Sequence, residues 1–161
     1  MTDATTTTSS PAQLEASITI AATPARVWAL VTDVTRMSSW SPQVLRTFVL
    51  GGPVRLGTRF ININHDGWKH WLTTAKVVRF EPHRHFAFRI SENRTVWSFT
   101  LEPTAEGAGT VLTQRRETPD GISPVSNALV QLVLGGQESF LSGLRAGMAQ
   151  TLERLKADAE R

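Results

Sequence analysis

The sequence contains neither cysteine nor tyrosine. Without cysteine the chain has no disulfide framework, no thiolate nucleophile and no cysteine-ligated metal. This suits a reducing compartment, and we expect a cytoplasmic protein. Because tyrosine is also absent, almost nothing titrates between the histidines and the basic residues. A net charge of only +3 therefore gives a pI of about 10.2.

The basic residues do not predict nucleic-acid binding, because they are scattered along the chain apart from Arg115 and Arg116. A nucleic-acid footprint is a clustered patch. No run of about 20 apolar residues is present, so we expect no stable membrane insertion. Residues 1–13 are polar and rich in threonine and serine, and we expect a disordered tail there. Residues 14–161 then form a single domain, with hydrophobic residues making up 40% of the chain.

Motifs for common catalytic chemistry are missing as well. There is no G-x-S-x-G elbow, phosphate-binding loop, dinucleotide fingerprint or H-E-x-x-H zinc motif. His83 and His85 share one strand face, but no carboxylate spacing supports a metal there. We therefore expect no metal and no cofactor, and no catalytic residue is nominated. Glu117 is the carboxylate best placed to reach the mouth of a cavity.

The strongest pattern lies in residues 137–161. Its apolar residues recur at steps of three and four, which predicts one long helix with an apolar stripe: Phe140, Leu141, Leu144, Met148, Leu152, Leu155 and Ala159. Gly143 and Gly147 lie four apart, on one side of this helix. They either allow close packing of the helix on a sheet or leave room for a ligand between helix and sheet.

The rest of the chain predicts that sheet. Alternation of apolar and polar residues predicts strands at 14–21, 44–50, 58–64, 69–81, 83–91, 94–103 and 110–118. Two short helices, 25–32 and 35–40, follow the first strand. Strands joined by short turns must be antiparallel. The sequence thus predicts an α+β domain, in which a curved seven-stranded antiparallel sheet surrounds the C-terminal helix.

The segment at residues 20–42, IAATPARVWALVTDVTRMSSWSP, resembles the opening signature of the START-like, or Bet v 1-like, superfamily. Within this superfamily the segment is most similar to the bacterial polyketide cyclase/dehydrase-like SRPBCC proteins. GTRFININ at residues 57–64 and the segments 86–88 and 97–99 agree with this resemblance, which covers residues 14–160. It implies a helix-grip fold with a deep apolar cavity under the C-terminal helix. Family members bind lipids, sterols or polyketides, and some are aromatases or cyclases.

Alternation along the strands selects the side chains that face the helix. The aromatic ones either line a ligand site or fill an ordinary core. Asn62 and Asn64 either orient a ligand among apolar walls or bond to the protein itself. Gln114 is a weaker candidate, because the sequence does not show which of the alternating residues in 111–117 point inward. The predicted ligand-binding residues are Trp40, Phe60, Asn62, Asn64, Trp71, Phe88, Trp97, Phe99, Gln114, Gly143, Leu144, Gly147 and Met148.

Three functions follow as hypotheses. The first is binding of a small hydrophobic or aromatic molecule in the cavity. The second is a polyketide cyclase/dehydrase-type enzyme on the same pocket, which requires an inward carboxylate or histidine. The third is an interaction protein that forms a homodimer. The dimer surface would be residues 128–134, ALVQLVL, which are apolar nearly all round. Two alternatives for this segment are burial in the core and a lid near the cavity mouth.

Overall fold

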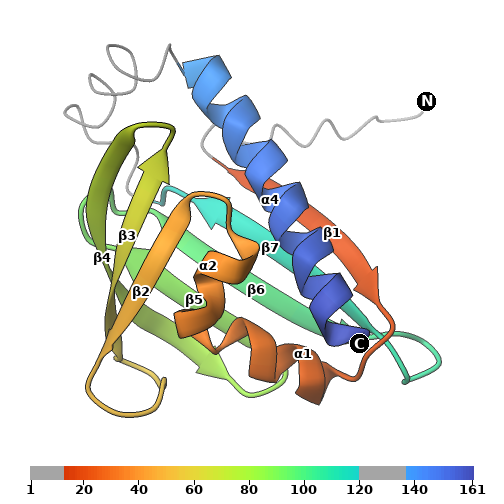
Figure 1. Ribbon diagram of the computed structural model, residues 1–161. Helices are drawn as coiled ribbons and strands as arrows, with labels where there is room; N and C mark the ends of the chain where they lie inside the picture. The colour runs from red at the N-terminus through yellow and green to blue at the C-terminus, as the bar shows by residue number, and fades with distance from the viewer. Residues whose placement is uncertain (1–12, 120–136) are drawn as a thin grey trace, which may run out of the picture.

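The structure is a computed structural model, and it describes residues 13–119 and 137–161. The predicted segment 128–134, and all but the last residue of the predicted tail, lie outside the described residues. In chain order (Figure 1) the elements are β1 (Leu14–Ile20), α1 (Pro24–Val31), η1 (Val34–Arg36), α2 (Met37–Trp40), β2 (Val44–Leu50), β3 (Arg59–Asp66), β4 (Lys69–Glu81), β5 (His85–Ile90), β6 (Val96–Pro103), β7 (Thr110–Glu117) and α4 (Gln137–Ala159).

The strands form one seven-stranded sheet in the order β1-β7-β6-β5-β4-β3-β2, and every neighbouring pair is antiparallel. The sheet curves, and α4 crosses its concave side, with α1 and α2 beside the C-terminal half of α4 (Figure 1). The predicted fold class is therefore confirmed. The two edges of the sheet are β1 and β2, which the sequence connects through the short helices.

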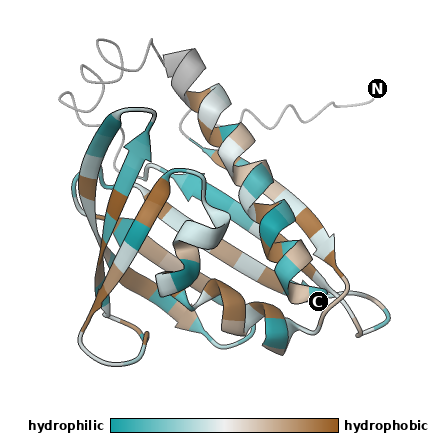
Figure 2. Cartoon of the chain, viewed as in Figure 1, coloured by the Kyte–Doolittle hydropathy of each residue, from teal (hydrophilic) through white to brown (hydrophobic). Residues whose placement is uncertain are grey.

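The start of α1 follows from its sequence. Thr23 has an extended backbone, and its hydroxyl oxygen accepts a hydrogen bond from the Arg26 amide at 3.3 Å. Pro24 occupies the first helical turn, where its missing amide hydrogen costs nothing. The helix then buries Trp28 against the edges of Phe80 and Phe86. This contact ties α1 to the sheet, and hydrophobic residues colour much of α1 and recur along the strands (Figure 2).

The inner face of β7 is settled by its burial pattern. Thr110, Leu112, Gln114 and Arg116 are buried, whereas the residues between them are only half-buried. Gln114 lies in register with Ala16 on β1 and Phe99 on β6. Glu117 therefore falls on the opposite face from Gln114 and Arg116 by the alternation of a strand.

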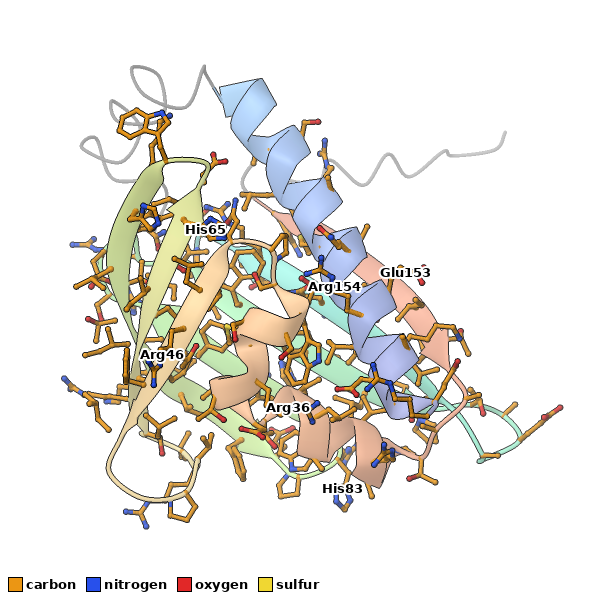
Figure 3. The ribbon with its side chains drawn as sticks, viewed as in Figure 1. Arg36, Arg46, His65, His83, Glu153 and Arg154 are labelled. Atoms are coloured by element: carbon orange, nitrogen blue, oxygen red, sulfur yellow. The ribbon has the colours of Figure 1, made fainter. Side chains whose placement is uncertain are left out.

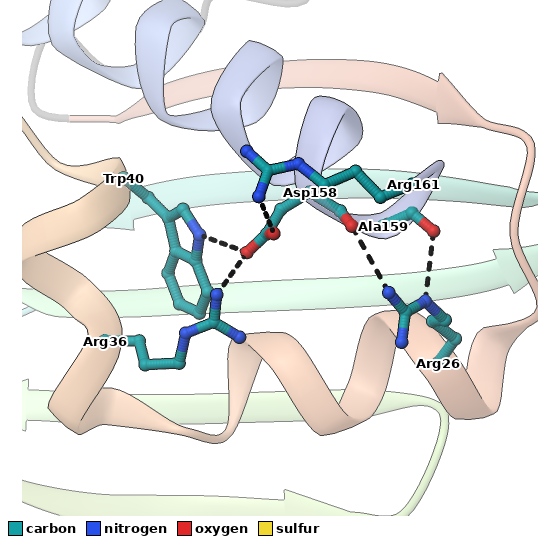
Figure 4. Close-up of polar contacts among 6 residues, drawn as sticks. All are labelled: Arg26, Arg36, Trp40, Asp158, Ala159 and Arg161. Carbon is teal, nitrogen blue, oxygen red and sulfur yellow. Dashed lines mark hydrogen bonds and ion pairs between the residues drawn. The ribbon is translucent and has the colours of Figure 1, made fainter.

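The C-terminal end of α4 is fixed by polar contacts with the short helices (Figure 4). Arg26 of α1 donates to the carbonyl oxygens of Ala159 at 3.1 Å and Asp158 at 3.3 Å, which would otherwise lack intrahelical partners. The Asp158 carboxylate accepts from Arg36 at 2.6 Å and from the Trp40 indole nitrogen at 3.4 Å. A single carboxylate thus joins η1, α2 and α4.

The end of β1 holds the same end of the helix. The Glu160 carboxylate accepts from the Ala21 amide at 2.8 Å and from Lys156 at 2.6 Å. The Ala21 amide and Lys156 together lower the pKa of Glu160 below its usual value. Lys156 also donates to the carbonyl oxygen of Thr19 at 2.8 Å. The last turns of α4 are therefore bound to both β1 and the helical segment that follows it.

The apolar stripe of α4 is shared between two clusters. Leu152, Leu155 and Ala159 pack into the main core with α1 and the sheet. Leu144 and Met148, nearer the N-terminal end, belong to a separate small cluster with Leu14 of β1. The C-terminal half of the helix thus carries both the polar anchors and the larger share of the core.

We predict that Asp158→Ala lowers the free energy of unfolding by about 1–3 kcal/mol, because the buried Trp40 indole loses its acceptor and Arg36 loses its partner. Urea denaturation measures this change. Glu153→Ala is the matched control, since Glu153 is an exposed residue of the same helix (Figure 3) and its side chain makes no hydrogen bond with the described residues. An equal loss in both variants would contradict the anchoring role.

Candidate functional site

A small pocket lies between the middle of α4 and the inner face of the sheet, beside the chain that leaves α2. Its volume is about 40 Å³. β6 and β7 supply one wall, α4 supplies another, and the segment after α2 closes the mouth. The lining residues are Ser41, Pro42, Gln43, Trp97, Gln114, Leu144, Gly147, Met148 and Thr151.

The walls of this pocket combine apolar side chains with the amides and hydroxyls of Ser41, Gln43, Gln114 and Thr151. Trp97, Leu144 and Met148 also pack in the small cluster with Leu14, so the pocket adjoins a hydrophobic region on the β1 side. At the mouth, Arg154 points from α4 toward α2 (Figure 3) and donates to the carbonyl oxygen of Trp40 at 3.4 Å. This contact holds the mouth segment close to the helix.

The two glycines of α4 have different surroundings. A β-carbon on Gly147 would lie 3.6 Å from the Cγ atom of Pro42, an ordinary contact across the pocket mouth. A β-carbon on Gly143 would meet no atom of the described residues within 4 Å, and this residue is exposed. The structure therefore brings Gly147 into the pocket lining and leaves Gly143 outside it.

The side-chain amides of Asn62 and Asn64 both form hydrogen bonds within the protein. The Thr47 hydroxyl donates to the Asn62 side-chain oxygen at 2.6 Å. The Asn64 side-chain nitrogen donates to the Thr73 hydroxyl at 2.9 Å. Both asparagines are buried, but neither lines the pocket. Their hydrogen bonds join β2 to β3 and β3 to β4.

Gln114 differs from both asparagines. Its side chain lines the pocket and the residue is only 6% exposed. Its Oε1 atom is buried, with no hydrogen-bond partner among the described residues. Buried amide oxygens in folded proteins nearly always have a hydrogen-bond partner, so a buried oxygen without one requires an explanation.

Arg116 is the next inward residue of β7, and it is also buried. Burial lowers the pKa of its guanidinium to about 10, because removal from water disfavours the charged form. The inner face of the sheet next to Gln114 is therefore poorly hydrated. In such surroundings each polar interaction is stronger than it is in water.

The remaining predicted residues lie elsewhere. Phe60, Phe88 and Phe99 belong to the main core, where the rings of Phe60 and Phe88 meet edge to face with centroids 5.2 Å apart. Trp40 is buried under the end of α4. Trp71 lies near the β3–β4 turn and is 39% exposed. The structure thus brings together Trp97, Gln114, Leu144, Gly147 and Met148 and separates the others from them.

Sequence reasoning did not nominate Ser41, Pro42, Gln43 or Thr151 as lining residues. Thr151 follows Gly147 by one helical turn, so the same spacing that selected Gly147 could have found it. Its hydroxyl donates to the Gly147 carbonyl oxygen at 2.8 Å. No local pattern marks the segment after α2, because it reaches the helix only through the tertiary fold.

A second hollow, of about 370 Å³, lies in the β2–β3 connection and is lined by residues 50–53 and 55–59. It is formed by one loop and the strand ends that the loop joins. Among the described residues no three histidine or acidic side chains come together as metal ligands. None of the described helices is long and apolar enough to span a membrane.

Comparisons with known proteins give one family and several solved structures. The model of the family described as "polyketide cyclase / dehydrase and lipid transport" matches residues 11–160. No curated protein matches the chain. The Zhui aromatase/cyclase from Streptomyces sp. R1128 is similar, with a TM-score of 0.74 and 17% identity over 92% of this chain and 93% of that one.

Two further structures are similar to this chain. The di-domain ARO/CYC StfQ from the steffimycin biosynthetic pathway has a TM-score of 0.74 and 16% identity, over 92% of this chain and 50% of that one. This chain thus spans half the length of the di-domain protein. The Polyketide_cyc-like protein Cgl2372 from Corynebacterium glutamicum has 27% identity and a TM-score of 0.55, over 89% of this chain and 88% of that one.

We predict that Gly143→Ala raises the free energy of unfolding by about 0.5–1 kcal/mol. Alanine restricts the unfolded chain and favours the helix, and the new methyl group would touch no atom of the described residues. Thermal and urea unfolding measure the change. A loss of stability would mean that Gly143 is packed against another part of the protein.

Proposed function

Because this chain belongs to the polyketide cyclase/dehydrase and lipid transport family, as the resemblance at residues 20–42 predicted, we propose that it binds a small hydrophobic or aromatic molecule between α4 and the sheet. The observation that carries the proposal is the pocket between Trp97, Leu144 and Met148, at the place where the family resemblance implies a cavity. A lipid and a polyketide are the two ligand types that the family description suggests. We further propose that the protein binds this ligand in the cytoplasm.

The size of the pocket implies that binding requires movement. Pockets for drug-sized ligands measure about 300–1,000 Å³, whereas this one measures about 40 Å³. The last turns of α4 carry the polar anchors, and the pocket lies beside the middle of the helix, at residues 144–151. We infer that the ligand separates the region around Gly147 from Pro42 while the end of the helix stays fixed.

Binding is favoured over catalysis by the chemistry of the lining. General acid–base catalysis needs a histidine, a carboxylate or a similar group within reach of the substrate. The described lining residues include none of these groups and offer amides, hydroxyls and apolar side chains. Glu117, the carboxylate that the sequence favoured, lies on the other face of β7 from Gln114.

Native mass spectrometry of the purified protein, followed by solvent extraction and small-molecule analysis, tests the proposal directly. We expect a stoichiometric adduct, either as purified or after addition of lipids and aromatic polyketides. The same spectrum reports whether the chain is a monomer or a homodimer. A mass that stays that of the bare chain under every addition would count against a ligand-binding role.

A matched pair of variants then tests the position of the ligand. We predict that Gly147→Leu weakens binding of the identified ligand at least about tenfold, because its side chain projects toward Pro42 and occupies the pocket mouth. Gly143→Leu adds the same side chain to an exposed position four residues away and should leave the affinity unchanged. Titration of each variant with the ligand measures the two affinities, and circular dichroism checks that both variants are folded. Equal affinities in the two variants would place the ligand elsewhere.

A further inference from the structure

We propose that Gln114 is the specificity-determining residue of this pocket, and that it selects ligands presenting an O–H or N–H donor to its side-chain oxygen. This inference rests on the proposed function, because it names the chemical class of ligand for the same site. A phenol, an alcohol or an amide-bearing molecule fits this requirement. A pure hydrocarbon does not.

The first argument comes from comparing the buried amides. Asn62 accepts from Thr47, and Asn64 donates to Thr73, so both are used by the protein to join neighbouring strands. The Gln114 oxygen has no partner among the described residues, although Gln114 is as buried as the asparagines. Of these amides, Gln114 is also the one that lines the pocket. An acceptor that no described residue uses, on a residue that lines a cavity, is available to a ligand.

The second argument comes from the surroundings of Gln114. Its neighbours in register are Ala16 and Phe99, and the pocket wall beside it includes Trp97 and Met148. None of these side chains offers a hydrogen bond to the amide oxygen in the structure. A buried carbonyl without a partner destabilises a protein. A ligand donor that binds this carbonyl therefore contributes more to the binding free energy than a donor at a water-exposed acceptor does.

The third argument concerns discrimination between ligands. A pocket that is only apolar distinguishes poorly between molecules of similar size and shape. A pocket with one unpaired acceptor rejects the analogue that lacks the donor, because that analogue leaves the acceptor buried and unsatisfied. Apolar walls formed by Trp97, Leu144 and Met148 would hold an aromatic ring or an alkyl chain, while Gln114 decides which polar group accompanies it.

The experiment uses two small probes of nearly equal size, phenol and fluorobenzene, titrated into the full-length protein and followed by NMR chemical shifts. The ratio of their affinities is measured in the natural protein and in Gln114→Met, an unbranched apolar replacement. Gln150→Met is the matched control, because Gln150 is an exposed residue of α4 that does not line the pocket. We expect the phenol-to-fluorobenzene affinity ratio to fall about tenfold in Gln114→Met and to stay constant in Gln150→Met.

Stability of the ligand-free protein provides a second readout. If the Gln114 oxygen is unsatisfied, Gln114→Met should unfold at the same or a higher urea concentration than the natural protein, since no hydrogen bond is lost. A clear drop in the urea midpoint would mean that the amide has a structural role, and it would overturn the inference.

The outcomes separate this inference from the function on which it rests. An unchanged probe ratio in Gln114→Met, with both probes bound, would overturn the role of Gln114 and leave ligand binding intact. An equal fall in Gln150→Met would also overturn it, because the loss would then not depend on the pocket amide. Failure of both probes to bind the natural protein at millimolar concentration would count against the ligand pocket itself, and the inference would fall with it.

Discussion

The attachment of one end of α4 is the constraint on which the rest of this structure depends. A carboxylate from Asp158 meets Arg36 and the Trp40 indole, and Arg26 satisfies the last carbonyl oxygens of the helix. Lys156 and Glu160 add contacts with the end of β1. These bonds fix the direction in which the helix crosses the curved sheet. They also place the N-terminal half of α4, with its smaller apolar cluster, over Trp97 and Gln114.

The satisfaction of polar groups separates structural residues from a candidate binding residue. Asn62, Asn64 and Gln114 have similar chemistry and similar burial. Hydrogen bonds from neighbouring strands account for the two asparagines. Gln114 lines a pocket, and its buried oxygen has no partner among the described residues. Burial alone would not distinguish them. The distinction matters because the family description covers both lipid transport and polyketide chemistry, and the polar group of the pocket is what would differ between ligands.

The two glycines of α4 have different roles because their surroundings differ. Gly147 lies close to Pro42, and Gly143 is exposed on the helix surface, although both have the same low helix propensity. A small residue at a crossing point permits close approach of another segment. A small residue on an exposed surface only weakens the helix. The pair therefore supplies its own control for experiments on the pocket.

The sequence by itself determined the elements, their antiparallel order and the family, because each depends on local information. Period-2 alternation, short turns and the stripe of α4 all lie within short windows of the chain. The site was not determined in this way. Partners such as Thr47 and Asn62, or Arg36 and Asp158, are brought together only when distant segments meet. Strand alternation put Asn62 and Trp71 on the inward face. Only the tertiary structure decided that Asn62 is satisfied, that Trp71 is partly exposed and that Gln114 faces the pocket, because these properties depend on which side chains surround each residue.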